Sequence, residues 1–236
     1  MARTIEPSSL GLRRSSLLEG LPAERLDAIA KACAWRLYSE GDQVVSRASS
    51  DRSVCLVSSG RVRVTTYSAS GRQVTFRDVA AGDWFGEVSA IDGLPRSADV
   101  QALEDTLLAT MPYDVFARLL KEEPAITQQV LQRLVRLVRS LSERVIDIST
   151  LGVQHRIHVE LLRLAHEAGV ADNAARIDPA PKHADLAGRV STYREQVSRE
   201  MSTLQQSGLL AKDGRALLVC DVKRLSQIVD QERLSS

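Results

Sequence analysis

A change in the spacing of apolar residues near the middle of the chain limits the folds that it can adopt. Over residues 37–112, apolar and polar residues alternate, as at Val62 and Val64 and again at Val74 and Phe76. The glycines that interrupt this segment are Gly41, Gly60, Gly71 and Gly82. A period of two broken by glycine turns is typical of short strands that bury one face. This half of the chain is therefore predicted to form a small β-roll that ends at Pro112.

Helical spacing precedes and follows this segment. In the stretch LPAERLDAIAKAC, apolar residues repeat at helical intervals after a proline, which predicts a helix before the first strand. After Pro112, apolar residues recur at spacings of 3, 4, 3, 4 and 3, at Leu131, Leu134, Val138, Leu141, Val145 and Ile148. This heptad pattern favours a two-stranded coiled coil and hence a homodimer. A core helix within one subunit remains an alternative, because Val130, Val135 and Leu137 broaden the apolar face.

The C-terminal third has the pattern of a winged helix-turn-helix. Gly152 is a plausible hinge, residues 154–168 have helical spacing, and residues 169–183 are interpreted as a polar connection. Residues 183–210 then indicate a helix, a short turn and a second helix. Two apolar runs flank Asp213-Gly214, a strong hairpin signal. The expected fold is α+β, with a β-roll domain at 1–125, a dimerisation helix and hinge at 126–151, and a DNA-binding domain at 152–236.

Composition excludes several classes of protein. The net charge of +1 argues against binding polyanions by bulk charge, so a nucleic-acid site must depend on local placement of charge. Apolar runs are far shorter than the roughly 18–20 residues of a membrane span, and the first residues lack a secretory core. The scattered Cys33, Cys55 and Cys220 form no CxxC motif and no Fe–S ligand set. We expect a cytoplasmic protein without a membrane partner.

The stretch FGEVSAIDGLPRSA, residues 85–98, places a carboxylate and a guanidinium in one short loop. Gly86 allows close approach of a ligand to the backbone. Arg96 offers a fork of donors for a phosphate, and Ser97 adds a hydroxyl. Together with the acceptor Glu87, this set suits a nucleoside 3′,5′-cyclic monophosphate, which has a phosphodiester and a free 2′-hydroxyl. A surface ion pair between Glu87 and Arg96 is an equal alternative at this point.

A second charged set lies on the last predicted helix of the helix-turn-helix. Arg194, Glu195 and Arg199 fall outside its apolar face, and arginine reads guanine while glutamate accepts from cytosine. The residues that could contact DNA phosphates are Lys182, Thr192 and Ser198. A solvated charged face is the competing interpretation.

The first motif resembles the phosphate-binding cassette of cyclic-nucleotide-binding domains, with F-G-E followed by R-S-A, and the strand SGRVRV upstream. The resemblance implies that Gly86, Glu87, Arg96 and Ser97 hold phosphate and ribose. It also implies apolar walls around the sugar and base, formed by Val64, Phe76 and Val88.

The helix TYREQVSRE resembles the recognition helix R-E-x3-R of the cyclic-AMP receptor group within the Crp/Fnr family of transcription regulators. The resemblance covers residues 20–225 in the family's order of domains. It implies a homodimer that binds palindromic double-stranded DNA with TGTGA-like half-sites, together with contacts to RNA polymerase. Arg194, Glu195 and Arg199 of each subunit would read one half-site.

Two positions depart from the family pattern. Cyclic-AMP receptors place a Thr-Ser pair on the dimer helix against the adenine, whereas this chain has Leu141 and Ser142. Arg77 stands at a wall position where a small polar residue is usual. The expected effector is cyclic AMP (cAMP), and a response to cyclic GMP (cGMP) or to both nucleotides stays open.

No catalytic constellation is present, so the chain is not expected to be an enzyme. His155, His158 and His166 have the spacing of helical metal ligands, but no cysteine or carboxylate completes a set, and no metal is predicted. Two rival hypotheses remain: a sensor enzyme or carrier that stores a nucleotide, and a ligand-independent regulator or a haem or Fe–S sensor of the same superfamily.

Overall fold

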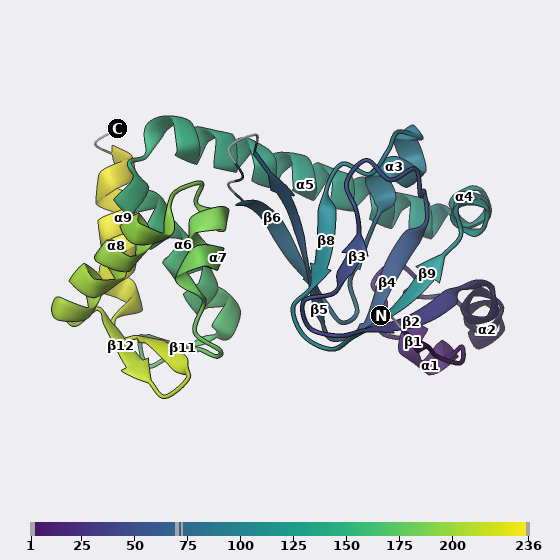
Figure 1. The fold of residues 1–236 in the computed structure, drawn as a ribbon, viewed down its shortest axis with the longest axis horizontal. Helices are drawn as coiled ribbons and strands as arrows, with labels where there is room; N and C mark the ends of the chain where they lie inside the picture. The colour runs from purple at the N-terminus through teal and green to yellow at the C-terminus, as the bar shows by residue number, and fades with distance from the viewer. Residues whose placement is uncertain (1–2, 69–70, 72, 235–236) are drawn as a thin grey trace. The chain divides into compact units, whose positions relative to one another are not determined.

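The computed structural model describes residues 3–68, 71 and 73–234 (Figure 1). The chain divides into two compact units, residues 1–137 and 138–236. The division falls inside one long helix, α5 (Pro124–Thr150), and the hinge expected at Gly152 stays a prediction.

The first unit contains two antiparallel sheets that form the predicted β-roll. One sheet has the order β1 (Arg3–Thr4), β2 (Ala34–Tyr38), β9 (Thr106–Met111), β4 (Val54–Ser59) and β7 (Trp84–Phe85). The other has the order β3 (Gln43–Val45), β8 (Asp99–Ala102), β5 (Arg61–Tyr67) and β6 (Gln73–Ala80). Val57 and Leu108 of the first sheet and Val62 and Val79 of the second share one buried cluster. The alternation of apolar residues thus gives each sheet one buried face.

Helices pack a second apolar cluster against the first sheet. They are α1 (Ser9–Leu12), α2 (Ala23–Ala32), α4 (Tyr113–Glu122) and the first half of α5. The three longer helices contribute Ile29, Phe116 and Val130 among their buried residues, and Trp35 of β2 belongs to the same cluster. The indole Nε1 of Trp35 donates to the carbonyl of Ala30 at 2.9 Å, so this buried donor is satisfied.

Helix α5 presents two different apolar faces. Ile126 and Val130 are buried, and Leu134 packs against the same cluster. A second stripe is exposed in the single chain and consists of Leu131, Val135, Val138, Leu141, Val145 and Ile148. Leu134 therefore belongs to the core face, and Val135 takes its place on the exposed stripe.

The second unit contains the second half of α5 and a winged helix-turn-helix. Its remaining elements are α6 (Val153–Ala168), β10 (Val170–Ala171), β11 (Ala174–Ile177), α7 (His183–Arg189), α8 (Arg194–Gln206), β12 (Leu210–Asp213), β13 (Ala216–Val219) and α9 (Val222–Leu234). The strands form one sheet in the order β10-β11-β13-β12. Leu186 and Val190 of the first helix-turn-helix segment and Val197 and Met201 of α8 are buried together, as their spacing predicts.

The structure corrects one local expectation and adds detail to two other segments. Residues 169–183 are not simply a polar connection, because β10 and β11 form a hairpin there. Its turn residues Asp172 and Asn173 have φ values of 49° and 62°, which these residue types tolerate. In the next hairpin Asp213 pairs with Ala216, so Gly214 and Arg215 form the turn. Helix α9 was not expected.

None of the helices in the described part of the chain is long and apolar enough to cross a membrane.

Candidate functional site

The cassette begins where the short strand β7 turns into the helix α3 (Glu87–Asp92). Gly86 makes this turn with φ of 100°, a conformation that favours glycine. A Cβ at this position would lie 2.6 Å from Nη1 of Arg96 and 2.7 Å from the carbonyl oxygen of Ser53. Glycine is thus required both by the backbone and by the close approach of Arg96.

Arg96 is buried and held by groups from two segments, residues 51–53 and 86–89. Its Nη1 donates to the carbonyl of Gly86 at 3.2 Å and to Oγ of Ser89 at 3.1 Å. Its Nη2 donates to the carbonyl of Ser53 at 2.6 Å and to Oδ2 of Asp51 at 2.5 Å. Nε of Arg96 is buried without a hydrogen-bond partner. The guanidinium is therefore fixed in place with one donor left over.

Asp51 is the charged partner of Arg96 and is itself half exposed. Burial opposes ionisation of its carboxyl, but hydrogen bonds from Arg96 and Ser53 outweigh burial, and the pKa of Asp51 lies below its ordinary value. An anionic ligand at Arg96 would share the guanidinium with this carboxylate.

Glu87 is buried and faces a different pair of arginines. Its Oε1 accepts a hydrogen bond from Nη2 of Arg77 at 3.3 Å and lies 3.8 Å from Nε of Arg133. Glu87 and Arg96 thus make their ion pairs with different partners, and the simple Glu87–Arg96 ion pair is not what the structure contains. One carboxylate and one guanidinium are held separately within the same cassette.

The other residues expected around a nucleotide have varied exposure. Val64 and Val88 are half-buried, and Ser97 is exposed. Phe76 is 41% exposed, because the register of β5 and β6 shifts between Val64 and Thr65 and leaves Phe76 as an extra residue. The predicted alternation is broken at this bulge.

The predicted base-reading residues lie in the second half of α5. Leu141 is 40% exposed, and the hydroxyl of Ser142 donates to the carbonyl of Val138 at 2.9 Å. They belong to the second unit, whereas the cassette belongs to the first. Their approach to a nucleotide therefore stays a prediction.

The predicted DNA-reading side chains share the exposed face of α8. Arg194, Glu195 and Arg199 are exposed, and the opposite face of the helix buries Val197 and Leu204. This arrangement follows from the helical period and leaves all three side chains open to a partner.

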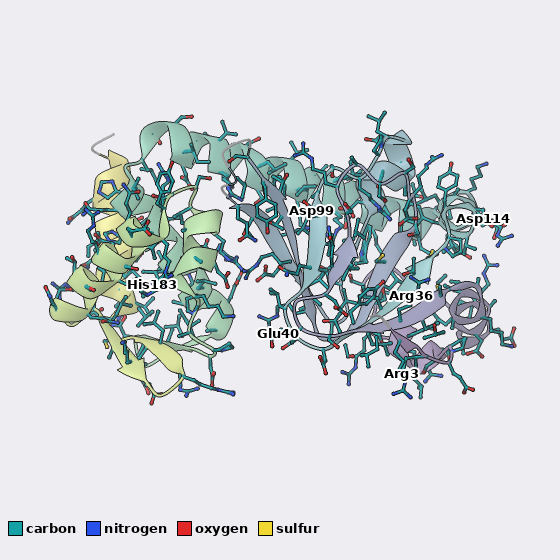
Figure 2. All side chains as sticks on the ribbon, in the orientation of Figure 1. Arg3, Arg36, Glu40, Asp99, Asp114 and His183 are labelled. Atoms are coloured by element: carbon teal, nitrogen blue, oxygen red, sulfur yellow. The ribbon has the colours of Figure 1, made fainter. Side chains whose placement is uncertain are left out.

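The residues expected to contact phosphates divide into two groups. Lys182 is exposed just before α7, and Ser198 is half-buried. Ser198 Oγ lies 2.7 Å from Nδ1 of His183, the first residue of α7, labelled in Figure 2. Thr192 is buried and its hydroxyl donates to Oε1 of Gln196. The Thr192 hydroxyl thus serves the turn between the helices in this structure, and its contact with a DNA phosphate stays a prediction.

Several residues that hold the side chains of the cassette in place could not be predicted from the sequence. Asp51 and Ser53 hold Arg96 from more than 40 positions away, and Arg133 reaches the cassette from α5. Their sequence context carried no motif. His158 pairs with Glu200 at 2.7 Å inside the second unit, so it is engaged in a structural contact. Within the described residues, no cluster of three or more His, Cys, Asp or Glu side chains could hold a metal.

Comparison with known proteins supports both the cassette of the β-roll and the helix-turn-helix. Residues 35–123 match the family model described as the cyclic nucleotide-binding domain, and residues 155–228 match the Crp-like helix-turn-helix domain.

Similar proteins span almost the whole chain. The CRP-like cAMP-activated global transcriptional regulator of Mycobacterium tuberculosis is 23% identical, over 92% of this chain and 97% of the relative. The cyclic AMP receptor protein of Thermus thermophilus is 27% identical, over 84% and 89% of the two chains. Among solved structures, a CooA mutant from Carboxydothermus hydrogenoformans superposes with a TM-score of 0.76 at 21% identity, over 96% and 98% of the two chains.

The β-roll with its cassette, the long helix and the winged helix-turn-helix occur here in the order of the two matched domains. The chain belongs to the Crp/Fnr family of transcription regulators.

Proposed function

We propose that this protein is a transcription regulator whose binding to DNA depends on a cyclic nucleotide, with cAMP as the effector. The observation that supports this proposal most strongly is the cassette, in which the buried Arg96 and the buried Glu87 each have separate ion-pair partners. Arg96 suits the cyclic phosphate and Glu87 suits the ribose 2′-hydroxyl, which are the two groups that distinguish such a ligand. The similar proteins include a cAMP-activated regulator and a cyclic AMP receptor protein, which supports this choice.

The same proposal includes a homodimer that reads TGTGA-like palindromes. From Val138 to Ile148 the exposed stripe of α5 keeps the 3, 4, 3 spacing of a coiled-coil seam, and its six large apolar side chains favour burial against a second copy. Two α8 helices in a two-fold dimer would then place Arg194, Glu195 and Arg199 in successive major grooves. RNA polymerase is the expected further partner of a regulator of this kind.

Nucleotide binding would act on DNA affinity through a shift of populations. A ligand that binds the DNA-competent state tenfold more tightly supplies about 1.4 kcal/mol. Helix α5 carries both Arg133, which contacts the cassette, and Arg144, which donates to the carbonyls of Gly188 and Arg189 at 3.2 and 2.6 Å. One continuous helix thus bears a contact with each domain.

A cGMP or dual response is the second candidate. Leu141 stands where a hydrogen-bonding threonine is expected to select adenine, so base selectivity has lost one polar contact. Ser97 is exposed on the cassette and its hydroxyl can bond either base.

Calorimetric titration of the full chain with cAMP and with cGMP, each with and without a TGTGA palindrome, tests the proposal. We expect cAMP to bind and to bind more tightly when DNA is present, because linkage is reciprocal. Tighter binding of cGMP would favour the second candidate. Binding of neither nucleotide, together with full DNA affinity, would favour the ligand-independent alternative.

A further inference from the structure

We propose that Arg77 is a positioning residue that fixes the Glu87 carboxylate, so that the site demands a hydroxyl on the sugar of its ligand. The inference rests on the proposed function for the class of ligand. What it adds is a role for an arginine on β6 that stands opposite Val64 in the strand register.

Both arginine contacts to Glu87 use the same carboxylate oxygen. Nη2 of Arg77 and Nε of Arg133 approach Oε1, at 3.3 and 3.8 Å. Among the described residues, no side chain or backbone group makes a hydrogen bond or ion pair with Oε2. The carboxylate is therefore held by one oxygen, and the other is the acceptor that a ligand hydroxyl can use.

The two arginines do not hold Glu87 equally. The guanidinium of Arg133 is engaged by Asp83 at 2.5 and 3.2 Å and by the carbonyl of Trp84 at 2.6 Å. It also stacks over the Trp84 ring, 4.4 Å from the centroid. Its approach to Glu87 at 3.8 Å is too long for a hydrogen bond. Within the described chain, the side chain that donates a hydrogen bond to Glu87 is Arg77.

Arg77 makes few other polar interactions that would compensate for its burial. Its side chain is 26% exposed, and its other recorded ion pair, with Asp83, is at the 4.0 Å limit. Burial lowers the pKa of its guanidinium, with Glu87 acting in the opposite direction. A partly desolvated arginine directed at one carboxylate oxygen restricts the rotation of that carboxylate. The orientation of Oε2 thus depends on Arg77.

The test measures one ratio: the affinity for cAMP divided by that for 2′-deoxy-cAMP, by calorimetry on the full chain. In the wild type we expect a ratio of about ten or more, since the missing hydrogen bond is to a charged acceptor. Arg77→Met keeps the aliphatic stem but removes the donor. We expect it to weaken cAMP binding about tenfold and 2′-deoxy-cAMP binding little, so that the ratio falls about tenfold, towards one. Arg77→Lys should restore part of the ratio.

Arg63→Met is the matched control. Arg63 lies on the neighbouring strand β5, its side chain is 7% exposed, and it pairs with Asp78 at 2.8 Å rather than with Glu87. We expect this variant to keep the wild-type ratio even if both affinities shift. A general effect of losing a buried arginine would change the ratio in neither variant.

The possible results distinguish a failure of the role assigned to Arg77 from a failure of the proposed function. An unchanged ratio in Arg77→Met, or a wild type that does not distinguish the two nucleotides, overturns the inference and leaves the proposed function standing. Binding of neither nucleotide by the wild type overturns both. If Arg77→Met does not fold, as judged by circular dichroism, the ratio in Arg77→Lys decides: it should fall between one and the wild-type value, and a wild-type ratio there refutes the role.

Discussion

Replacing Arg96 by alanine should weaken both the first unit and its ligand binding. The side chain makes five recorded hydrogen bonds, to Gly86, Ser89, Asp51 and twice to Ser53. Removing it leaves two buried carbonyls and one carboxylate without their donor. Because water can replace part of these contacts, we expect the free energy of unfolding to fall by about 2–4 kcal/mol rather than by the sum.

Tryptophan fluorescence during urea unfolding isolates the relevant transition. The chain has two tryptophans, Trp35 and Trp84, and both are buried in the first unit. The fluorescence signal therefore follows the unit that carries Arg96, and a separate transition of the helix-turn-helix does not enter it. Arg25→Ala is the control, since Arg25 pairs with Glu122 on the surface and should change the unfolding energy little.

The difference between wild type and Arg96→Ala should depend on pH. The pKa of folded Asp51 lies below its ordinary value of about 3.9, so this group stabilises the wild type above about pH 4. That stabilisation is lost as the pH falls through the lowered folded pKa. In the variant the hydrogen bond from Arg96 is gone, so the gap between the proteins should narrow from pH 5 towards pH 3. A gap that widens on acidification would refute the assigned Arg96–Asp51 pairing.

The same variant should lose cyclic-nucleotide binding. Calorimetry that gives Arg96→Ala the affinity of the wild type for cAMP would remove Arg96 from the proposed phosphate site.

Three further predictions concern the other domains. Glu195→Ala should relax one base position by about 1–3 kcal/mol while phosphate-driven binding persists, and an unchanged sequence preference in a binding-site selection would contradict it. Leu141→Thr should favour cAMP over cGMP by about 1 kcal/mol, roughly fivefold, and calorimetry that shows no change would remove this position from base reading. Val138→Glu, at a position 62% exposed in the single chain, should weaken the dimer by roughly 2 kcal/mol or more. Sedimentation velocity should show the shift to monomer, while tryptophan-detected unfolding stays as in the wild type.

Elements with a strong period could be predicted from the sequence. The alternation ending at Pro112 gave the β-roll, and the spacing of Leu186, Val190, Val197 and Met201 gave the two helices of the helix-turn-helix. The hairpin of β10 and β11 was missed because its strands are short and its residues mostly small or polar, so no alternation was visible. Its Asp172-Asn173 turn was the available signal.

The residues of the candidate site also fall into those that the sequence predicted and those that it did not. Gly86, Glu87 and Arg96 lie in one continuous motif, so local sequence revealed them together. Asp51 comes from the loop before β4 and Arg77 from strand β6, and only the fold brings them to the cassette. The competition between an internal ion pair and a ligand site could not be settled from spacing, because the partners of both charged residues are distant in sequence. The burial of Thr192 was equally hidden, since its hydroxyl donates to the Gln196 side chain on the next helix.

The dependence of DNA binding on the nucleotide can be measured by fluorescence anisotropy. A labelled TGTGA palindrome is titrated with the full chain, with and without cAMP, at one fixed salt concentration. We expect cAMP to raise the affinity for the palindrome about tenfold or more, to raise the affinity for a scrambled duplex much less, and to have no such effect in Arg96→Ala. Equal affinity with and without nucleotide, or an increase that is the same for the scrambled duplex, would contradict this expectation.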